Sequence, residues 1–289
     1  MLVAALLLAS CPALMVQRRR LLATSSLVAA SSFAGTEPAV ALGALIEVTD
    51  PQTYSALVYS PPGGSRGGRP LPLLVVLHGA GRNEGPVWSL SDMQGEHAGL
   101  APSLLASGRA PPELAEEFAM VAPYAGAGRR SFYEEPRRKL LEFVEWVCSP
   151  AGRLAGCPEV DRSRLFLFGF SDGATVAVEL ATTRRFAAAV VAAYGFTGSL
   201  PALATQRLKD VPLWFFHSAD DAIFSVANSD NLVRTLRQAG SEVVRYTRYE
   251  CDQEGFTGRV QGHSTGITAS KQGEVYRWLL AQPPLPAWT

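Results

Sequence analysis

The chain has 289 residues, of which 47% are hydrophobic and 18% charged, and its 26 basic and 26 acidic side chains cancel. This composition is typical of a globular protein with one sizeable core, since α/β folds often extend to about 250 residues as one domain. The balanced charge excludes the strongly basic surface that binds nucleic acid or an anionic membrane.

The first 41 residues have the pattern of an export signal. Arginines at 18–20 precede an apolar, Ser-rich run that ends in Ala39-Val40-Ala41. A positive segment, an apolar segment and small residues at a cleavage site are the parts of such a signal. The apolar run 2–16 is too short to cross a bilayer comfortably. We predict a leader over 1–41, a mature chain without a stable membrane span, and a secreted, periplasmic or organelle-lumenal location. The alternative is a start that targets nothing.

Short apolar runs and amphipathic segments alternate through the remaining residues, 42–289. Such alternation predicts one α/β domain, a mostly parallel sheet with helices on both faces. The expected strands are 46–60, 71–77, 118–123, 161–168, 187–194, 212–216 and 243–249, and the expected helices are 90–107, 136–148, 172–180, 228–239 and 270–280.

Two cysteines, Cys148 and Cys157, lie nine residues apart in a segment rich in glycine and proline. In an exported protein such a pair would form a disulfide. The alternative is two buried free thiols.

The segment Gly169-Phe170-Ser171-Asp172-Gly173 separates an apolar run from a run of small, helix-compatible residues. A strand that turns abruptly into a helix lifts the serine hydroxyl clear of the sheet. The flanking glycines are then needed because side chains there would collide across the turn. The pattern alone also fits a glycine-containing loop, so its weight comes from the strand before it and the helix after it.

Ser171, Asp221 and His263 follow one another in the order nucleophile, acid, base, each just past the end of a predicted strand. A serine hydroxyl is a poor nucleophile unless an imidazole takes its proton. The imidazole in turn needs a carboxylate that fixes its tautomer and stabilises its positive charge. Asp221 also fits a simple turn or capping residue.

The strand 71–77 ends in His78-Gly79-Ala80-Gly81. A dinucleotide site is excluded because no helix begins where the pyrophosphate would need it. A tight turn there would instead supply the N–H of Ala80 to an oxyanion hole, together with the N–H of Asp172.

These segments resemble the α/β-hydrolase superfamily, in its branch of carboxylesterases, phospholipase/thioesterase-like enzymes and predicted peptidases. The resemblance covers about Tyr54 to Leu280. Ser218 stands where the family has Gly, and Phe224-Ser225 stand where it has Val-Pro; the family's spacing selects Asp221 over Asp220 as the acid. The matching motifs are 77–81, 169–173, 212–221 and 262–264.

The resemblance implies a serine hydrolase that cleaves carboxylic esters or thioesters through an acyl-enzyme, on a small-molecule or polymer-attached substrate, with no cofactor or metal. A serine peptidase on the same triad and a catalytically silent binding module are the alternatives. Phe132, Tyr133 and Phe170 would form the pocket wall, although aromatics of this kind also fill cores. The 17 residues between Tyr194 and Pro212 allow one short helix, so we expect no lid and an open cleft.

Overall fold

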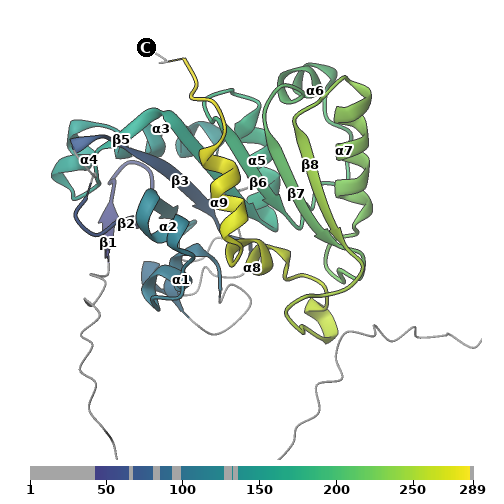
Figure 1. The fold of residues 1–289 in the computed structure, drawn as a ribbon, viewed down its shortest axis with the longest axis horizontal. Helices are drawn as coiled ribbons and strands as arrows, with labels where there is room; N and C mark the ends of the chain where they lie inside the picture. Colours follow the sequence, from purple (N-terminus) through teal and green to yellow (C-terminus); the bar gives the residue numbers. More distant parts are fainter. Residues whose placement is uncertain are drawn as a thin grey trace, which may run out of the picture. The chain divides into compact units, whose positions relative to one another are not determined.

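The computed structural model describes residues 43–64, 68–80, 85–92, 99–126, 132 and 136–286. The predicted leader therefore lies outside the described residues, within which no helix is long and apolar enough to cross a membrane. The described strands form one sheet (Figure 1) in the order β1-β2-β4-β3-β5-β6-β7-β8. The strands are β1 Ala44–Thr49, β2 Ser55–Ser60, β3 Leu71–Leu77, β4 Ala119–Pro123, β5 Val160–Phe170, β6 Ala188–Ala192, β7 Leu213–Ser218 and β8 Val244–Tyr249.

The sheet is mostly parallel, as predicted. β1 and β2, and β2 and β4, pair antiparallel, whereas every pair from β4 across to β8 is parallel. Successive side chains of a strand point to opposite faces. In β3, Leu73, Val75 and Leu77 enter one apolar core and Leu74 and Val76 enter the other. An unbroken apolar run is thus what a strand buried on both faces requires.

Helices cover both faces. One core is closed by α3, α5, α6 and α7, and the other by α1, α2, α8 and α9; α9 crosses the near face in Figure 1. The helices are α1 Ala101–Ala106, α2 Pro112–Glu117, α3 Arg137–Val147, α4 Pro150–Leu154, α5 Asp172–Ala181, α6 Ala202–Leu208, α7 Ala227–Gln238, α8 Thr265–Ser270 and α9 Gly273–Leu280, with 3₁₀ turns η2 Val87–Ser91 and η4 Gly258–Val260.

Three predicted elements differ from the structure. The strand expected over 46–60 is a hairpin, because the Asp50 carboxylate accepts from the Gln52 N–H at 3.2 Å and closes a turn between β1 and β2. A helix was expected over 90–107. In the described part of that range the structure has the last two residues of the 3₁₀ turn η2, which begins at Val87, and the six residues of α1. The closing helix is two helices, α8 and α9, since Gln272 is extended between them.

Of the two alternatives for Cys148 and Cys157, a disulfide or two buried thiols, the structure has the two free thiols. Cys148 ends α3 and Cys157 follows α4, and both are buried in the core that α3 covers. Burial raises the pKa of Cys148 to about 12 and that of Cys157 to about 11. They therefore act as small apolar side chains rather than as reactive thiols.

We predict that iodoacetamide at about pH 8 modifies neither Cys148 nor Cys157 in the folded protein, because the thiolate is the reactive form. Alkylation in guanidinium chloride, followed by peptide mass spectrometry, should modify both. Modification of either cysteine in the native state, or a Cys148–Cys157 cross-linked peptide, would contradict the assignment.

Candidate active site

Ser171 lies in a strained turn between β5 and α5. Its backbone has φ 59° and ψ −124°, which an L-residue other than glycine rarely adopts. The Ser171 N–H donates to the Ala192 carbonyl at 2.9 Å, and the Ser171 carbonyl accepts from the Ala174 N–H at 2.9 Å. The strand is therefore still paired when the helix begins, and the chain reverses within one residue.

Both flanking glycines are sterically required. A Cβ at Gly169 would lie 2.4 Å from the Gly173 carbonyl oxygen, and a Cβ at Gly173 would lie 2.2 Å from the Leu77 carbonyl oxygen. The collisions expected from the sequence are thus present. The second contact also places the turn after β3, which contains Ala80, directly against the start of α5.

The structure brings Ser171, His263 and Asp221 into one chain of hydrogen bonds. His263 Nε2 lies 2.9 Å from Ser171 Oγ, and His263 Nδ1 lies 2.9 Å from Asp221 Oδ2. Ser171 and His263 are each 6% exposed, and the Asp221 side chain is fully buried. Segments 50 and 42 residues apart in the sequence, from Ser171 to Asp221 and from Asp221 to His263, meet at the carboxyl edge of the sheet.

Asp221 is held as a carboxylate. Its Oδ1 accepts from the Ile223 and Phe224 N–H groups, each at 2.9 Å. Burial raises the pKa of Asp221, but hydrogen bonds from His217, His263 and the Phe224 N–H outweigh burial and hold the pKa well below its usual range. The negative charge next to His263 is therefore present at neutral pH.

Asp220, the other candidate acid, points to a different set of donors. It accepts from the Ser218 hydroxyl at 2.5 Å and from the Asp252 N–H at 3.2 Å. The hydrogen bond to Asp220 gives a structural role to the hydroxyl of Ser218, the residue that stands where the family has glycine. Asp220 ties the loop after β7 to the loop after β8, and Asp221 is the carboxylate that contacts His263.

The loops that carry the acid and the base are packed backbone against backbone. Gly262 has φ +71°, and a Cβ there would lie 2.4 Å from the backbone nitrogen of Asp221. The Asp252 carboxylate accepts from the Gly262 N–H at 2.8 Å, and the Ala222 N–H donates to the Gln261 carbonyl at 2.9 Å. The position of His263 relative to Asp221 is thus fixed by neighbouring backbone.

Two of the predicted pocket residues, Phe132 and Phe170, are buried, each 1% exposed. The Phe170 ring lies 5.1 Å from the His263 ring, and the Phe132 ring lies 4.7 Å from the His78 ring. Each packs against an imidazole of the site and limits its rotation. The third predicted residue, Tyr133, lies outside the described residues.

Of the predicted oxyanion donors, Ala80 lies in the turn after β3, and the residues that open this turn contact the start of α5. Asp172 is the first residue of α5, and the initial N–H groups of a helix have no intrahelical acceptor. Burial raises the pKa of the Asp172 carboxyl, which His263 partly offsets. His78 Nδ1 donates to the Gly79 carbonyl at 2.7 Å and Nε2 accepts from the Ala125 N–H at 3.2 Å, so His78 shapes the turn.

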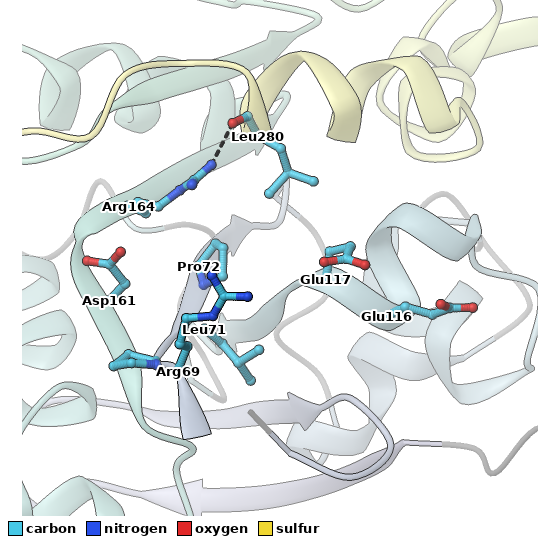
Figure 2. Close-up of a pocket in the computed structure, with 9 residues that line it drawn as sticks. Arg69, Leu71, Pro72, Glu116, Glu117, Asp161, Arg164 and Leu280 are labelled. Carbon is cyan, nitrogen blue, oxygen red and sulfur yellow. Dashed lines mark hydrogen bonds between the residues drawn. The ribbon is translucent and has the colours of Figure 1, made fainter. Parts of the chain in front are cut away.

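A charged pocket of about 380 Å³ lies at the opposite edge of the sheet, where β3 and β5 begin (Figure 2). Arg164, one of its lining residues, donates to the Leu280 carbonyl at 2.5 Å and so anchors the end of α9. No described serine, threonine, cysteine or histidine lines the pocket. It is lined by Arg69, Pro70, Leu71, Pro72, Glu116, Glu117, Asp161, Arg164 and Leu280.

Among the residues that the structure describes, no three His, Cys, Asp or Glu side chains are grouped to hold a metal ion.

Three residues of the site were not assigned from the sequence: His217, Ser229 and Asp252. His217 directly precedes the Ser218-Ala219-Asp220-Asp221 run, and that proximity was the only local signal. Ser229 lies on α7 and Asp252 follows β8. Their contacts with the site depend on the folded chain and leave no spacing pattern.

Comparisons with known proteins agree with this architecture. Residues 149–272 match the model of the Dienelactone hydrolase family. No curated protein matches the sequence.

Solved structures share the fold at low sequence identity. A thermostable esterase has a TM-score of 0.62 and 22% sequence identity. The match covers 84% of this chain and 64% of the esterase chain. A fluorophosphonate-binding serine hydrolase of Staphylococcus aureus has a TM-score of 0.55 and 15% identity, covering 84% of this chain and all of that one. An acylaminoacyl peptidase of Pyrococcus horikoshii has a TM-score of 0.53 and 14% identity. That match covers 83% of this chain and 41% of the peptidase chain. At these identities the likeness shows the fold, and the named activities are those of the three proteins.

We predict that Gly262→Ala destabilises the protein much more than Gly258→Ala. Both glycines have positive φ, but only Gly262 has backbone atoms in the place of the added Cβ. The shared backbone penalty is about 1 kcal/mol, and the overlap should add about 2 kcal/mol at Gly262. Urea unfolding measures the difference. Equal destabilisation would show that the contact between the two loops can relax.

Proposed function

We propose that this chain, which belongs to the α/β-hydrolase superfamily, is a serine hydrolase that cleaves carboxylic esters or thioesters through an acyl-enzyme. One observation carries the proposal. Ser171, His263 and Asp221 form an unbroken hydrogen-bonded chain, with both bonds at 2.9 Å. The order of hydroxyl, imidazole and carboxylate is the one that nucleophilic acyl transfer requires.

The acylation step follows from this order. Ser171 Oγ attacks the substrate carbonyl carbon while His263 Nε2 takes the hydroxyl proton. Asp221 keeps the other ring proton on Nδ1 and stabilises the imidazolium. When the tetrahedral intermediate collapses, the bond to the leaving group breaks and His263 gives that group its proton. The product of this step is an ester of Ser171.

Deacylation repeats the step with water as the nucleophile. His263 takes a proton from water as the water oxygen attacks the acyl carbon. The bond between the acyl carbon and Ser171 Oγ then breaks, His263 returns the proton to Oγ, and the carboxylic acid leaves. In both steps we assign the oxyanion to the N–H groups of Ala80 and Asp172. Donors aimed at the developing negative charge are worth about 3 kcal/mol each. All of these groups belong to the chain.

Peptide cleavage on the same residues is the second candidate. The acylaminoacyl peptidase that shares the fold supports it, and the chemistry differs only in the leaving group. A purely binding role is less well supported, because a binding module has no need of the aligned Ser171, His263 and Asp221. Rates on matched p-nitrophenyl esters and p-nitroanilides separate ester cleavage from peptide cleavage. If neither substrate is hydrolysed, the binding role is favoured.

We also propose export, with residues 1–41 as the leader that is removed. The small residues at 39–41 support a cleavage site. The first described strand, β1, begins at Ala44, so removal up to Ala41 would leave every described strand in the chain.

We predict that Ser171→Ala lowers kcat on p-nitrophenyl acetate by about 10⁶-fold and that Asp221→Asn lowers it by about 10⁴-fold. Asp220→Asn is the matched control, because Asp220 binds the base loop and does not contact His263. It should cost less than about tenfold. A larger loss in Asp220→Asn than in Asp221→Asn, or full activity in Ser171→Ala, would refute the assignment.

We predict a preference for short acyl groups. The connection between β6 and β7, described throughout, contains a single helix of seven residues, α6, which is too short to form a packed lid. Each methylene that stays in water forgoes about 0.8 kcal/mol of binding. Values of kcat/KM for p-nitrophenyl esters from acetate to palmitate measure the preference. A rise that continues beyond octanoate would reveal a deep acyl tunnel.

A further inference from the structure

His217 is a fully buried imidazole at the end of β7 that none of the catalytic steps above uses. Its Nδ1 lies 2.7 Å from Ser229 Oγ on α7. Its Nε2 lies 3.0 Å from the Phe224 carbonyl oxygen and 3.3 Å from Asp221 Oδ2. The ring therefore bridges the helix and the acid of the triad.

These partners determine where the ring proton of His217 lies. The Phe224 carbonyl and the Asp221 carboxylate only accept hydrogen bonds, so Nε2 must carry a hydrogen. In the neutral ring Nδ1 then has a lone pair, and Ser229, whose hydroxyl can donate, faces it. A donating Ser229 hydroxyl thus favours the tautomer whose Nε2–H faces both the Phe224 carbonyl and the Asp221 carboxylate.

We propose that His217 is a positioning residue for the reaction, held by Ser229 in the Nε2–H tautomer so that it donates to Oδ2 of Asp221. The chain of hydrogen bonds then extends over five residues, from Ser229 on α7 to the nucleophile. This inference rests on the proposed hydrolase function for its kinetic consequences, whereas the tautomer is independent of activity.

The bridge has two consequences for Asp221. First, four donors occupy the carboxylate: the Ile223 and Phe224 N–H groups at Oδ1 and the two imidazoles at Oδ2. The carboxylate cannot rotate away from His263 without losing one of them. Second, His217 shares the oxygen that faces His263, so part of the charge on that oxygen is already compensated.

Removing the His217 N–H should therefore change the pH dependence of catalysis in one direction. With Oδ2 facing His263 alone, the carboxylate stabilises the protonated imidazole more strongly. Since the reaction needs the unprotonated base, the acid limb of the kcat/KM profile should move to higher pH. A role confined to packing would lower the fraction of folded enzyme and leave the acid limb in place.

The other charged groups around the site remain unchanged in such variants. Asp172 faces His263 from the start of α5. The remaining carboxylates nearby have their own partners: Asp220 binds Ser218 and the Asp252 N–H, Asp252 binds the Gly262 N–H, and Asp230 on α7 binds the Tyr246 hydroxyl. A shift in the acid limb can thus be assigned to His217.

The kinetic test compares three variants with a control, using p-nitrophenyl acetate and circular dichroism to verify folding. His217→Leu should move the acid limb up by about one pH unit and lower kcat by about 10- to 100-fold. His217→Gln keeps an N–H donor near the Nε2 position, so its acid limb and its kcat should both lie close to those of the wild type. Ser229→Ala should give a smaller shift in the same direction. The control, Ser270→Ala, removes a buried hydroxyl that has no hydrogen-bond partner and should shift nothing.

A folded His217→Leu with an unchanged acid limb overturns the proposal, as does His217→Gln behaving like His217→Leu. If His217→Leu fails to fold, the Ser229→Ala variant provides the test. An unchanged acid limb in Ser229→Ala then overturns the proposal.

Nitrogen-15 spectra of the histidine rings give the second test. The chain has only four histidines, and His78, with its proton on Nδ1, is an internal reference of opposite tautomer. We expect His217 as the Nε2–H tautomer in the wild type, with the preference weakened in Ser229→Ala. An Nδ1–H tautomer would overturn the proposal. A wild type without hydrolase activity would instead refute the proposed function, and the spectra would still test the tautomer.

Discussion

The site depends on how closely four chain segments approach one another at the carboxyl edge of the sheet, where only glycine leaves enough room. Gly173 sets the start of α5 against the end of β3, and Gly262 sets the base loop against the acid loop. These contacts join backbone to backbone, so they cannot be relieved by a side chain changing its rotamer. The relative positions of Ser171, Asp221 and His263 follow from them, because each lies within two residues of such a contact.

A second constraint is the buried charge of Asp221. A carboxylate removed from water is costly unless donors replace its hydration. Two N–H groups of its own turn and the imidazoles of His263 and His217 supply the replacement. The pKa of Asp221 stays low as a result. The same donors fix the orientation of the carboxylate, so the electrostatic and geometric requirements of the site are met by one set of bonds.

Much of this could be predicted from the sequence. The strand at 71–77 and the second half of the strand at 161–168 were recognisable because both faces are buried and the apolar run is unbroken. Ser171 was recognisable because the turn between strand and helix needs two glycines. The choice of Asp221 over Asp220 came from the family's spacing, and the structure gives a physical reason for it, since Asp220 is occupied by Ser218 and the base loop.

The rest depended on contacts distant in the sequence. Phe132 and Phe170 are aromatic residues near the ends of predicted strands, and only the fold shows that they pack against imidazole rings. The spacing of Cys148 and Cys157 fits a disulfide as well as two thiols in one core. The partner of His217, Ser229, is determined by how α7 packs on β7.

The central claim is that Ser171 is the nucleophile, and a fluorophosphonate probe tests it most directly because it reacts with a serine only where the neighbouring base activates it. The purified chain should take up one probe, on the peptide that contains Ser171, and His263→Ala should abolish the labelling. Labelling of a different residue in an active enzyme, or ester hydrolysis by a preparation that the probe neither labels nor inhibits, would contradict the account.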